Sequence, residues 1–320
     1  MESGPQCASQ VVLVRPTGFG FDPDTATTNG FQQQVRDADV RRKAEAEFDE
    51  LLHALDRCGI GTTVLDPIDP GAPNAVFPNN WFSTHADGRV VLYPMCSSSR
   101  RTERDPRLGE KLRRAGFQVE DVLDLSGREE ELLFLEGTGS LVLDRTERTA
   151  YAVLSPRTSE PVLNAWCEAT GHRYVAFNAT MDGTLLGDPV YHTNVVMSIG
   201  ERFAVVCLDA IPYPGERKEV RMELELAGKD IIPITVEQMH AFVGNLLQLR
   251  SRPTPQFASA SFILLSSTAF AALDPGQRQR LEKYGQLVPV PVPTIETVGG
   301  GSVRCMLAEN FLPLRSAAKA

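Results

Sequence analysis

The feature that most constrains the fold is a repeat of about 57 residues that runs along the whole chain. Five segments share one order of residue types: an amphipathic polar run, then a glycine, then a short run of β-prone residues. The glycines are Gly59, Gly116, Gly171, Gly228 and Gly285, at successive intervals of 57, 55, 57 and 57 residues. At a helix end, glycine adopts the left-handed C′ conformation without strain, and the chain then turns into a strand. One such joint is common in α/β proteins, but five at one period indicate a repeat architecture.

Helical and extended segments alternate around these glycines. Residues 35–55 are rich in Ala, Glu and Arg and carry an apolar stripe, which predicts an amphipathic helix. Strands are expected at 11–14, 90–93, 141–143, 151–154, 195–199, 203–208 and 262–265, and the Pro-rich run 288–293 as a strand with edge prolines. We therefore predict an α/β fold of five β/α units around a closed ring. The strands lie inside, the helices lie outside, and residues 1–320 form a single catalytic domain. The strand at 11–14 is expected to pair with the C-terminal unit and close the ring.

Composition and charge exclude several classes of protein. The chain is 42% hydrophobic and 23% charged, which is typical of globular domains and excludes disorder, a collagen-like rod and a coiled coil. With 32 Lys and Arg against 41 Asp and Glu, the net charge is −9 and no basic block is present, so neither nucleic acid nor a membrane is expected as a partner. No run approaches the roughly 18 apolar residues of a membrane span, and the start of the chain lacks the basic region of a secretory signal.

The cysteines and histidines are scattered. The 6 cysteines form no CxxC pair and the 5 histidines form no HxH or HExxH arrangement. In a chain of this length that pattern predicts reduced thiols, a cytoplasmic location, no metal site and no cofactor.

The segment TVGGGSVRCM at 297–306 carries the strongest signal of chemistry. Its three consecutive glycines let the backbone pass close to a ligand, and backbone N–H groups near a helix start stabilise an anion. We expect a short helix at 306–310 that begins beside Cys305. A thiol at a helix N-terminus loses its proton more readily than a free thiol, so Cys305 is a candidate nucleophile. From this segment alone, a small buried core cysteine is an equally good interpretation.

Two other segments hold groups that could act with a thiol. In YHTN, His192 precedes the strand expected at 195–199, a position where a histidine can serve as the acid and base for a cysteine. In FLEGTGSL, Glu136 stands between aliphatic residues and a Gly-x-Gly, which alone is too weak a pattern to indicate a nucleotide site. Either residue, taken alone, also fits a structural role. Because Cys305, His192 and Glu136 belong to different repeats, inward-pointing strand ends would bring them together in a central channel.

A fourth segment, PNNWFSTH, contains Asn79, Asn80 and His85. Its turn and two aromatic residues fit the lining of a pocket or a packed turn. In this order, the motifs PNNWF, LEG, YH and GGGxxxC resemble the guanidino-modifying, or pentein, superfamily over most of the chain. That superfamily includes arginine deiminases, agmatine deiminases, dimethylarginine hydrolases and amidinotransferases.

The resemblance implies a fold and a set of site residues. The implied fold is a five-bladed pseudo-symmetric α/β propeller of ββαβ units. The implied catalytic groups are a Cys nucleophile, a His acid and base and a Glu beside it, which match Cys305, His192 and Glu136. Two arginines that hold the substrate's carboxylate match Arg100 in PMCSSSR and Arg157 in SPRTS. For either arginine alone, an exposed ion pair is an alternative interpretation.

Two positions depart from the arginine deiminase pattern, in which aspartates grip the guanidinium. His85 and Asn194 occupy those positions here. A buried guanidinium without a carboxylate partner is destabilised by several kcal/mol, on the order of a lost buried ion pair. A neutral ureido group instead suits amide donors and acceptors. The resemblance is therefore closest to the citrulline-utilising hydrolases, which release ornithine, ammonia and carbon dioxide. We expect a covalent Cys305 intermediate and substrate contacts from Asn79, Asn80, His85, Arg100, Arg157 and Asn194.

Other functions stay open at this point. An arginine deiminase or dimethylarginine-type hydrolase would hold a guanidinium with Glu136 alone. An amidinotransferase would differ only in letting an amine replace water. A non-catalytic binding protein, like the ribosome-binding translation factor that shares this fold, would not need the Cys, His and Glu set. The expected partner is a small amino-acid substrate, and the oligomeric state, a homo-oligomer included, is left open.

Overall fold

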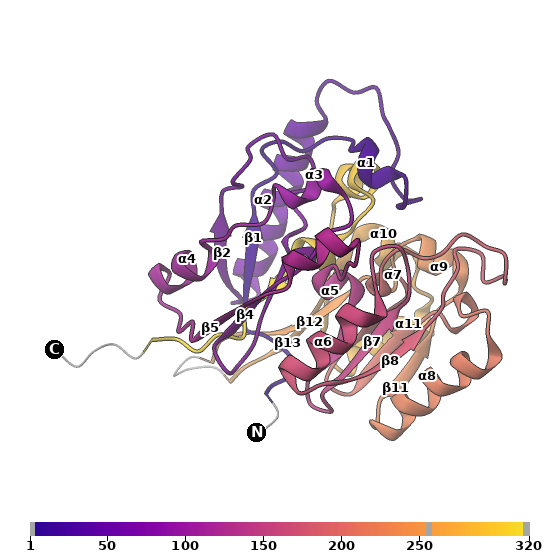
Figure 1. Ribbon diagram of the computed structural model, residues 1–320. Coiled ribbons are helices and arrows are strands. Elements are labelled where there is room, and N and C mark those ends of the chain that lie inside the picture. The colour runs from indigo at the N-terminus through magenta and orange to yellow at the C-terminus, as the bar shows by residue number, and fades with distance from the viewer. Residues whose placement is uncertain (1–3, 254–257, 316–320) are drawn as a thin grey trace.

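The computed structural model describes residues 4–253 and 258–315, and there the strands form five three-stranded sheets (Figure 1). In each sheet two strands are antiparallel, and a third pairs parallel with the middle strand after a helical crossover. The strands are β1 Gln10–Val14, β2 Gly61–Leu65, β3 Phe82–Thr84, β4 Arg89–Leu92, β5 Asp121–Asp124, β6 Val142–Asp144, β7 Thr149–Val153, β8 Arg173–Phe177, β9 Met197–Ile199, β10 Phe203–Val206, β11 Asp230–Pro233, β12 Leu247–Arg250, β13 Ser261–Ser266, β14 Gln286–Val290 and β15 Ala308–Glu309.

Helices connect the strands of each sheet and cover their outer sides. The α-helices are α1 Pro23–Ala26, α2 Val40–Arg57, α3 Ser98–Arg101, α4 Leu108–Arg114, α5 Gly137–Ser140, α6 Glu160–Thr170, α7 Thr193–Val196, α8 Pro214–Leu226, α9 Val236–His240, α10 Ser267–Ala272 and α11 Pro275–Glu282. Short 3₁₀ or π turns are η1 Pro78–Asn80, η2 Ser126–Glu131, η3 Leu208–Ala210, η4 Ile295–Gly299 and η5 Val303–Met306. The amphipathic stripe of α2 buries Phe48, Leu51 and Leu55 in one cluster with Val11 and Leu13 of β1. Each such fully buried side chain stabilises the fold by about 1.5–3 kcal/mol.

The sheets follow one another around a ring, and the C-terminal strand completes the first of them. Strand β15 contacts β3, and β9 contacts both β6 and β12, so these strands face the centre. Strand β15 also pairs antiparallel with β1, with Val11 opposite Glu309. In Figure 1 the yellow C-terminal segment accordingly lies beside the indigo N-terminal elements. The predicted pairing of strand 11–14 with the C-terminal unit is confirmed.

Four of the five repeat glycines have the predicted conformation. Gly59, Gly116, Gly171 and Gly228 have φ values of 65°, 95°, 69° and 68° after their helices. Gly285 differs, because α11 ends earlier and Gly285 leads directly into β14. A Cβ there would lie 3.0 Å from the Ser261 carbonyl oxygen, so close packing, not a positive φ, favours glycine at this position.

Four predicted elements differ from those observed. The helix expected at 35–55 begins only at Val40 and continues to Arg57. The helix expected at 306–310 is absent, because residues 308–309 form β15 against β1 and Cys305 lies in the η5 turn instead. The strand expected at 195–199 begins only at Met197, after the helical turn α7. The strand expected at 288–293 ends at Val290 as part of β14. Within the described residues no helix is long and apolar enough to cross a membrane.

Candidate active site

Loops from several blades converge on one pocket. Its lining comes from the segments 25–32, 74–80, 191–192 and 299–305, together with Arg100 and Arg157. The space that remains open to water is about 20 Å³, room for about one water molecule. The pocket is therefore narrow, and Cys305 and His192 both lie on its wall.

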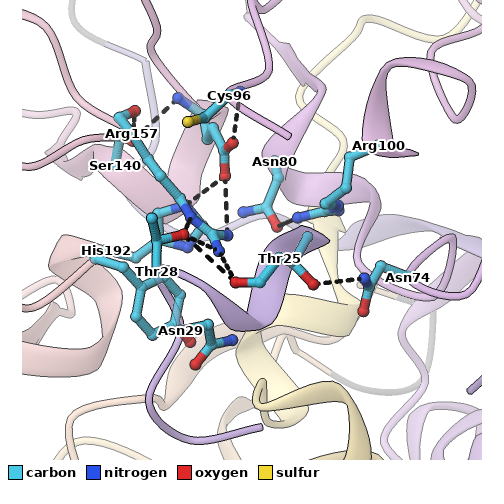
Figure 2. Close-up of polar contacts among 12 residues, drawn as sticks. Thr25, Thr28, Asn29, Asn74, Asn80, Cys96, Arg100, Ser140, Arg157 and His192 are labelled. Carbon is cyan, nitrogen blue, oxygen red and sulfur yellow. Dashed lines mark hydrogen bonds and ion pairs between the residues drawn. The ribbon is translucent and has the colours of Figure 1, made fainter. Parts of the chain in front are cut away.

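His192 and Glu136 form a buried pair at this pocket. His192 directly precedes α7 and Glu136 directly precedes α5, and His192 Nε2 lies 2.8 Å from Glu136 Oε2. The other carboxylate oxygen, Oε1, accepts from the Cys96 backbone N–H at 3.0 Å (Figure 2). Both side chains are almost completely buried. A Cβ on Gly139 would lie 2.8 Å from His192 Nδ1, so only glycine at this position leaves room for the ring.

The surroundings settle the charges of this pair. Burial opposes ionisation of Glu136, but Arg157 and the His192 hydrogen bond outweigh it, so the pKa of Glu136 lies well below its usual range. Burial lowers the pKa of His192 to about 4, although the Glu136 hydrogen bond opposes the shift. At neutral pH an ionised carboxylate therefore accepts from the Nε2–H of a neutral imidazole, and Nδ1 remains an acceptor.

The Cys305 sulfur is buried and is surrounded by amide donors. Asn245 Nδ2 donates to Sγ at 3.2 Å and Asn194 Nδ2 at 3.5 Å. The adjacent glycines leave no room for side chains, because a Cβ on Gly299 or Gly301 would lie less than 3.0 Å from the Phe77 ring. Gly300 has a φ of 63°, which only glycine adopts readily. The glycine triplet thus lets the chain pass close to the pocket, as the sequence predicted.

Arg100 is a buried member of a structural network. Its Nε and Nη2 donate to the Glu103 carboxylate at 3.0 and 2.8 Å, and Nη2 also donates to the Phe77 carbonyl. Its Nη1 donates to Asn80 Oδ1 at 2.7 Å (Figure 2). The alternative of an exposed ion pair is wrong for Arg100, since its side chain is only 3% exposed. The guanidinium holds Asn80 at the pocket.

Arg157 reaches into the pocket from the opposite side (Figure 2). Its Nε and Nη2 donate to Thr28 Oγ1 at 2.9 and 2.7 Å, and Nη2 also donates to the Thr25 carbonyl. Its Nη1 lies 3.4 Å from Glu136 Oε2, and its guanidinium lies over the Tyr191 ring. An exposed ion pair is wrong for Arg157 as well, because it is 2% exposed.

Residues 22–33, which we name the cover segment, line one side of the pocket. Asn29 Nδ2 donates to the Gly300 carbonyl at 3.2 Å, and Gln32 Nε2 donates to the Gly299 carbonyl at 3.0 Å. The Gln33 backbone N–H donates to the Thr297 carbonyl at 2.8 Å. These three hydrogen bonds hold the cover segment against the segment 297–300.

The predicted substrate contacts divide into three groups. Asn80, Arg100 and Arg157 line the pocket, and Asn194 touches the Cys305 sulfur. Asn79 is fully buried next to the pocket, and neither of its side-chain amide atoms has a hydrogen-bond partner in the described part of the chain. An unpaired buried amide group is destabilising by about 1–3 kcal/mol.

His85 lies outside this pocket, which corrects the expectation that it binds substrate beside Cys305. Strand β3 carries the chain away from Asn80, and His85 follows its last residue. His85 Nε2 lies 3.0 Å from Ser83 Oγ, and the ring lines a separate cavity with Arg145 and His172. Burial and the nearby Arg145 charge hold the pKa of His85 well below its ordinary value.

Several pocket residues were missed by sequence reasoning. The cover segment, Asn74 and Asn245 belong to no recognised motif. Asn74 lines the pocket, where its Nδ2 donates to Asp22 Oδ2 at 2.8 Å. The one sequence signal was the number of Asn and Gln residues in these loops, and it points to no particular partner. Within residues 4–253 and 258–315, no group of three or more His, Cys, Asp and Glu residues is arranged to hold a metal ion.

Comparisons with known proteins identify a family from the sequence and a fold from solved structures. The model of a family described as N,N dimethylarginine dimethylhydrolase, eukaryotic, matches residues 15–312. No curated protein matches the chain at the sequence level. Among solved structures, the unliganded ArgZ, an arginine dihydrolase from the ornithine-ammonia cycle in cyanobacteria, has a TM-score of 0.72 at 14% identity, over 97% of this chain and 41% of ArgZ.

Two further structures match over nearly their whole length. The substrate-bound N-terminal domain of a mutant ArgZ has a TM-score of 0.71 at 15% identity and covers 95% of this chain and 99% of that domain. A dimethylarginine dimethylaminohydrolase mutant, as an adduct with S-methyl-L-thiocitrulline, has a TM-score of 0.62 at 16% identity, over 94% and 98%. The chain thus spans about two fifths of full-length ArgZ but almost all of its N-terminal domain. At these identities the likeness establishes the fold, and the predicted five-bladed propeller is confirmed.

Proposed function

Because the chain belongs to the N,N dimethylarginine dimethylhydrolase family, within the guanidino-modifying pentein superfamily, we propose that it hydrolyses a guanidino amino acid, arginine or an N-methylated arginine. The predicted enzyme class, a hydrolase of non-peptide C–N bonds, is confirmed by this family. The observation that carries the proposal is the buried Glu136–His192 pair at the pocket that also holds Cys305. The guanidino alternative agrees better with the comparisons than citrulline, which the sequence favoured.

The proposed reaction is covalent, with Cys305 as nucleophile. The thiolate attacks the guanidino carbon, forming a C–S bond and moving the C=N electron pair onto nitrogen. The C–N bond to the terminal amine then breaks, and the amine leaves with the proton that His192 took from the Cys305 thiol when the thiolate formed. Water, deprotonated by His192, attacks the resulting thiouronium carbon. The C–S bond breaks and restores the thiolate, so arginine and water give citrulline and ammonia.

Glu136 and the two arginines have separate proposed roles. Glu136 supplies the negative charge that a guanidinium needs and keeps the His192 ring in place. Arg157 binds the substrate's α-carboxylate through Nε and Nη2, because these atoms now bond to a hydroxyl and a carbonyl of the cover segment, which a carboxylate can replace, while Nη1 stays beside Glu136. Arg100 acts through Asn80, since its guanidinium is already bonded to Glu103.

A second candidate is citrulline, and one observation favours it. Asn194 lies against the Cys305 sulfur at 3.5 Å, where the arginine deiminase pattern has an aspartate. A neutral amide at this point suits the neutral ureido carbon of citrulline more than a guanidinium. Hydrolysis of citrulline through the same thiolate would give ornithine, ammonia and carbon dioxide.

We also propose that residues 1–320 act as one catalytic domain. Strand β15 completes the sheet that β1 begins, and the pocket takes residues from both regions. The residues that line the pocket run from Thr25 to Cys305 and come from loops of at least three sheets, so a fragment that lacks either of these end regions lacks part of the site.

The function is tested by substrate consumption. The pure protein is incubated with arginine, asymmetric dimethylarginine, citrulline and agmatine in separate reactions, and mass spectrometry quantifies citrulline, ornithine and the released amines. The matched control is Cys305→Ser. We expect citrulline from arginine or dimethylarginine in the wild type and none in the variant. Consumption of citrulline alone would establish the second candidate, and no consumption of any compound would contradict both.

A further inference from the structure

Asn245 lies in a tight turn between α9 and β12 that is shaped to approach the pocket. The Asn245 backbone N–H donates to the Phe242 carbonyl at 2.9 Å, and Phe242 has a left-handed φ of 61°. A bulky residue rarely adopts this conformation, and such strain is typically held at functional sites. A Cβ on Gly244 would lie 2.2 Å from the Val195 carbonyl oxygen. Only glycine there lets the turn reach α7, and this contact brings Asn245 beside Cys305.

The Asn245 amide makes three contacts and is completely buried. Its Oδ1 accepts from the Arg304 backbone N–H at 3.1 Å. Its Nδ2 donates to the Asn194 backbone carbonyl at 2.9 Å and to the Cys305 sulfur at 3.2 Å. The Asn245 amide therefore links the backbone at Arg304, next to Cys305, to the backbone at Asn194, two residues after His192.

These neighbours determine which end of the amide faces the sulfur. A backbone N–H can only donate, so the group opposite Arg304 must be the amide oxygen. A backbone carbonyl can only accept, so the group that faces the Asn194 backbone carbonyl must be the Asn245 amide nitrogen. The reversed amide would lose both bonds. The Asn194 side chain is not oriented in this way, because its Oδ1 has no partner among the described residues.

We propose that Asn245 is a further catalytic residue, whose amide donates to the Cys305 sulfur and stabilises its thiolate. The proposal rests on the proposed function in taking Cys305 as the nucleophile. A thiolate accepts a hydrogen bond more strongly than a thiol, and a buried anion without donors is costly. A neutral donor stabilises the thiolate without placing a positive charge beside a cationic guanidinium substrate.

The test measures the fraction of Cys305 that is thiolate at each pH, in the absence of substrate. Absorbance at 240 nm is followed from pH 5 to pH 10, and the signal of the same protein carrying Cys305→Ser is subtracted. Asn245→Asp keeps the acceptor for Arg304 but removes the N–H from the sulfur and adds a negative charge. Asn245→Ala is the second variant, and Gln248→Ala, changed at a buried amide of the adjacent strand β12, is the control for the loss of a buried amide. Circular dichroism melts establish that each protein is folded.

We expect the midpoint of the thiolate signal to rise by about one pH unit in Asn245→Ala, or tenfold less thiolate at a given pH below the midpoint. The rise is larger in Asn245→Asp and absent in Gln248→Ala. Turnover at pH 7 falls most in Asn245→Asp, less in Asn245→Ala and not in Gln248→Ala. Raising the pH restores part of the turnover of Asn245→Ala. Unchanged midpoints in both folded Asn245 variants would overturn the proposal, even with reduced turnover. If the variants show this shift of the thiolate midpoint but the wild-type protein consumes no substrate, the proposed function alone is contradicted.

Discussion

Glu136 and His192 share a 2.8 Å hydrogen bond in a pocket with room for about one water molecule. Since the carboxylate is ionised and the imidazole neutral at pH 7, His192 can accept a proton and Glu136 stabilises the cation that results. In this arrangement the histidine needs its carboxylate partner to carry a proton through the reaction.

Removing either partner of this pair is expected to lower kcat. His192→Ala should reduce kcat by about 10²–10⁴-fold, because it removes general acid and base catalysis. Glu136→Gln should reduce kcat by at least about 10²-fold, since the imidazolium loses its counter-charge in a buried site. Steady-state kinetics on the preferred substrate measure both. A double variant no slower than the slower single variant would show that the pair acts as a unit, whereas fully multiplicative losses would contradict it.

Acidification is expected to destabilise the fold through His192, which is buried, and His172, which is half-buried. Burial lowers the pKa of His192 and of His172 to about 4, in each case against an ordinary value of 6.5. Below pH 6.5 the unfolded chain binds protons that the folded chain does not, so the free energy of unfolding falls as the pH falls toward 4. At pH 5 one such histidine lowers it by about 2 kcal/mol.

Urea denaturation at pH 7.5 and pH 5 measures this loss. The His172→Gln variant should lose less stability between the two pH values than the wild type. His53→Gln, changed at an exposed side chain of α2, serves as the control. An equal loss in wild type and His172→Gln would contradict the assignment.

Arg157→Gln is expected to raise KM for substrates with an α-carboxylate. The guanidinium can exchange its Thr25 and Thr28 contacts for the carboxylate, which a glutamine does not reproduce. KM for the amino-acid substrate should rise at least about tenfold, since a charged hydrogen bond contributes about 1.5–3 kcal/mol. Any turnover of agmatine, which lacks the carboxylate, should change much less. Equal effects on both substrates would rule out a carboxylate contact.

Arg100→Gln is expected to act on stability. It leaves the Glu103 carboxylate, which is 1% exposed, without its 2.8 Å ion-pair partner. Breaking a buried pair costs about 3–5 kcal/mol, which a thermal melt detects readily. The double variant with Glu103→Gln should recover part of the loss, because no unpaired charge is then buried. A double variant less stable than Arg100→Gln alone would refute this explanation.

Loss of the Asn29 and Gln32 contacts is expected to open the cover segment. Two hydrogen bonds contribute about 1–3 kcal/mol together, so Asn29→Ala with Gln32→Ala should raise the open fraction at least about fivefold. Hydrogen exchange at the Gln33 amide, which donates to the Thr297 carbonyl, reports this opening. Thr17→Ala, changed outside the segment, is the control. Unchanged exchange at Gln33 in the double variant would show that these bonds do not hold the segment closed.

The sequence predicted the parts of the fold that depend on local structure. Helix-ending glycines and β-prone runs recur along the chain, so the five units could be counted without a structure. The convergence of Cys305, His192 and Glu136 followed from their equivalent places in those units. The helix expected beside Cys305 was wrong because pairing with β1 overrides the local preference of residues 308–309.

The parts that could not be predicted depend on contacts between distant segments. Asn29 meets Gly300 across 271 residues, and no local pattern marks either as a partner. Asn245 likewise reaches Cys305 across 60 residues through a turn whose approach depends on Gly244. His85 was placed in the pocket by its motif, but the direction of β3 carries it elsewhere.

The pairing of β1 with β15 has a consequence for how the protein folds. Val11 leaves the ribosome well before its partner Glu309, which lies about three hundred residues further along the chain. Until then one edge of β1 is unpaired, and an unpaired hydrophobic edge is a template for aggregation. Contacts this far apart in sequence form slowly, because the intervening chain must first be ordered. The η5 turn with Cys305 directly precedes β15, so closing this sheet also fixes the position of the proposed nucleophile, and a chain synthesised only as far as β14 lacks it.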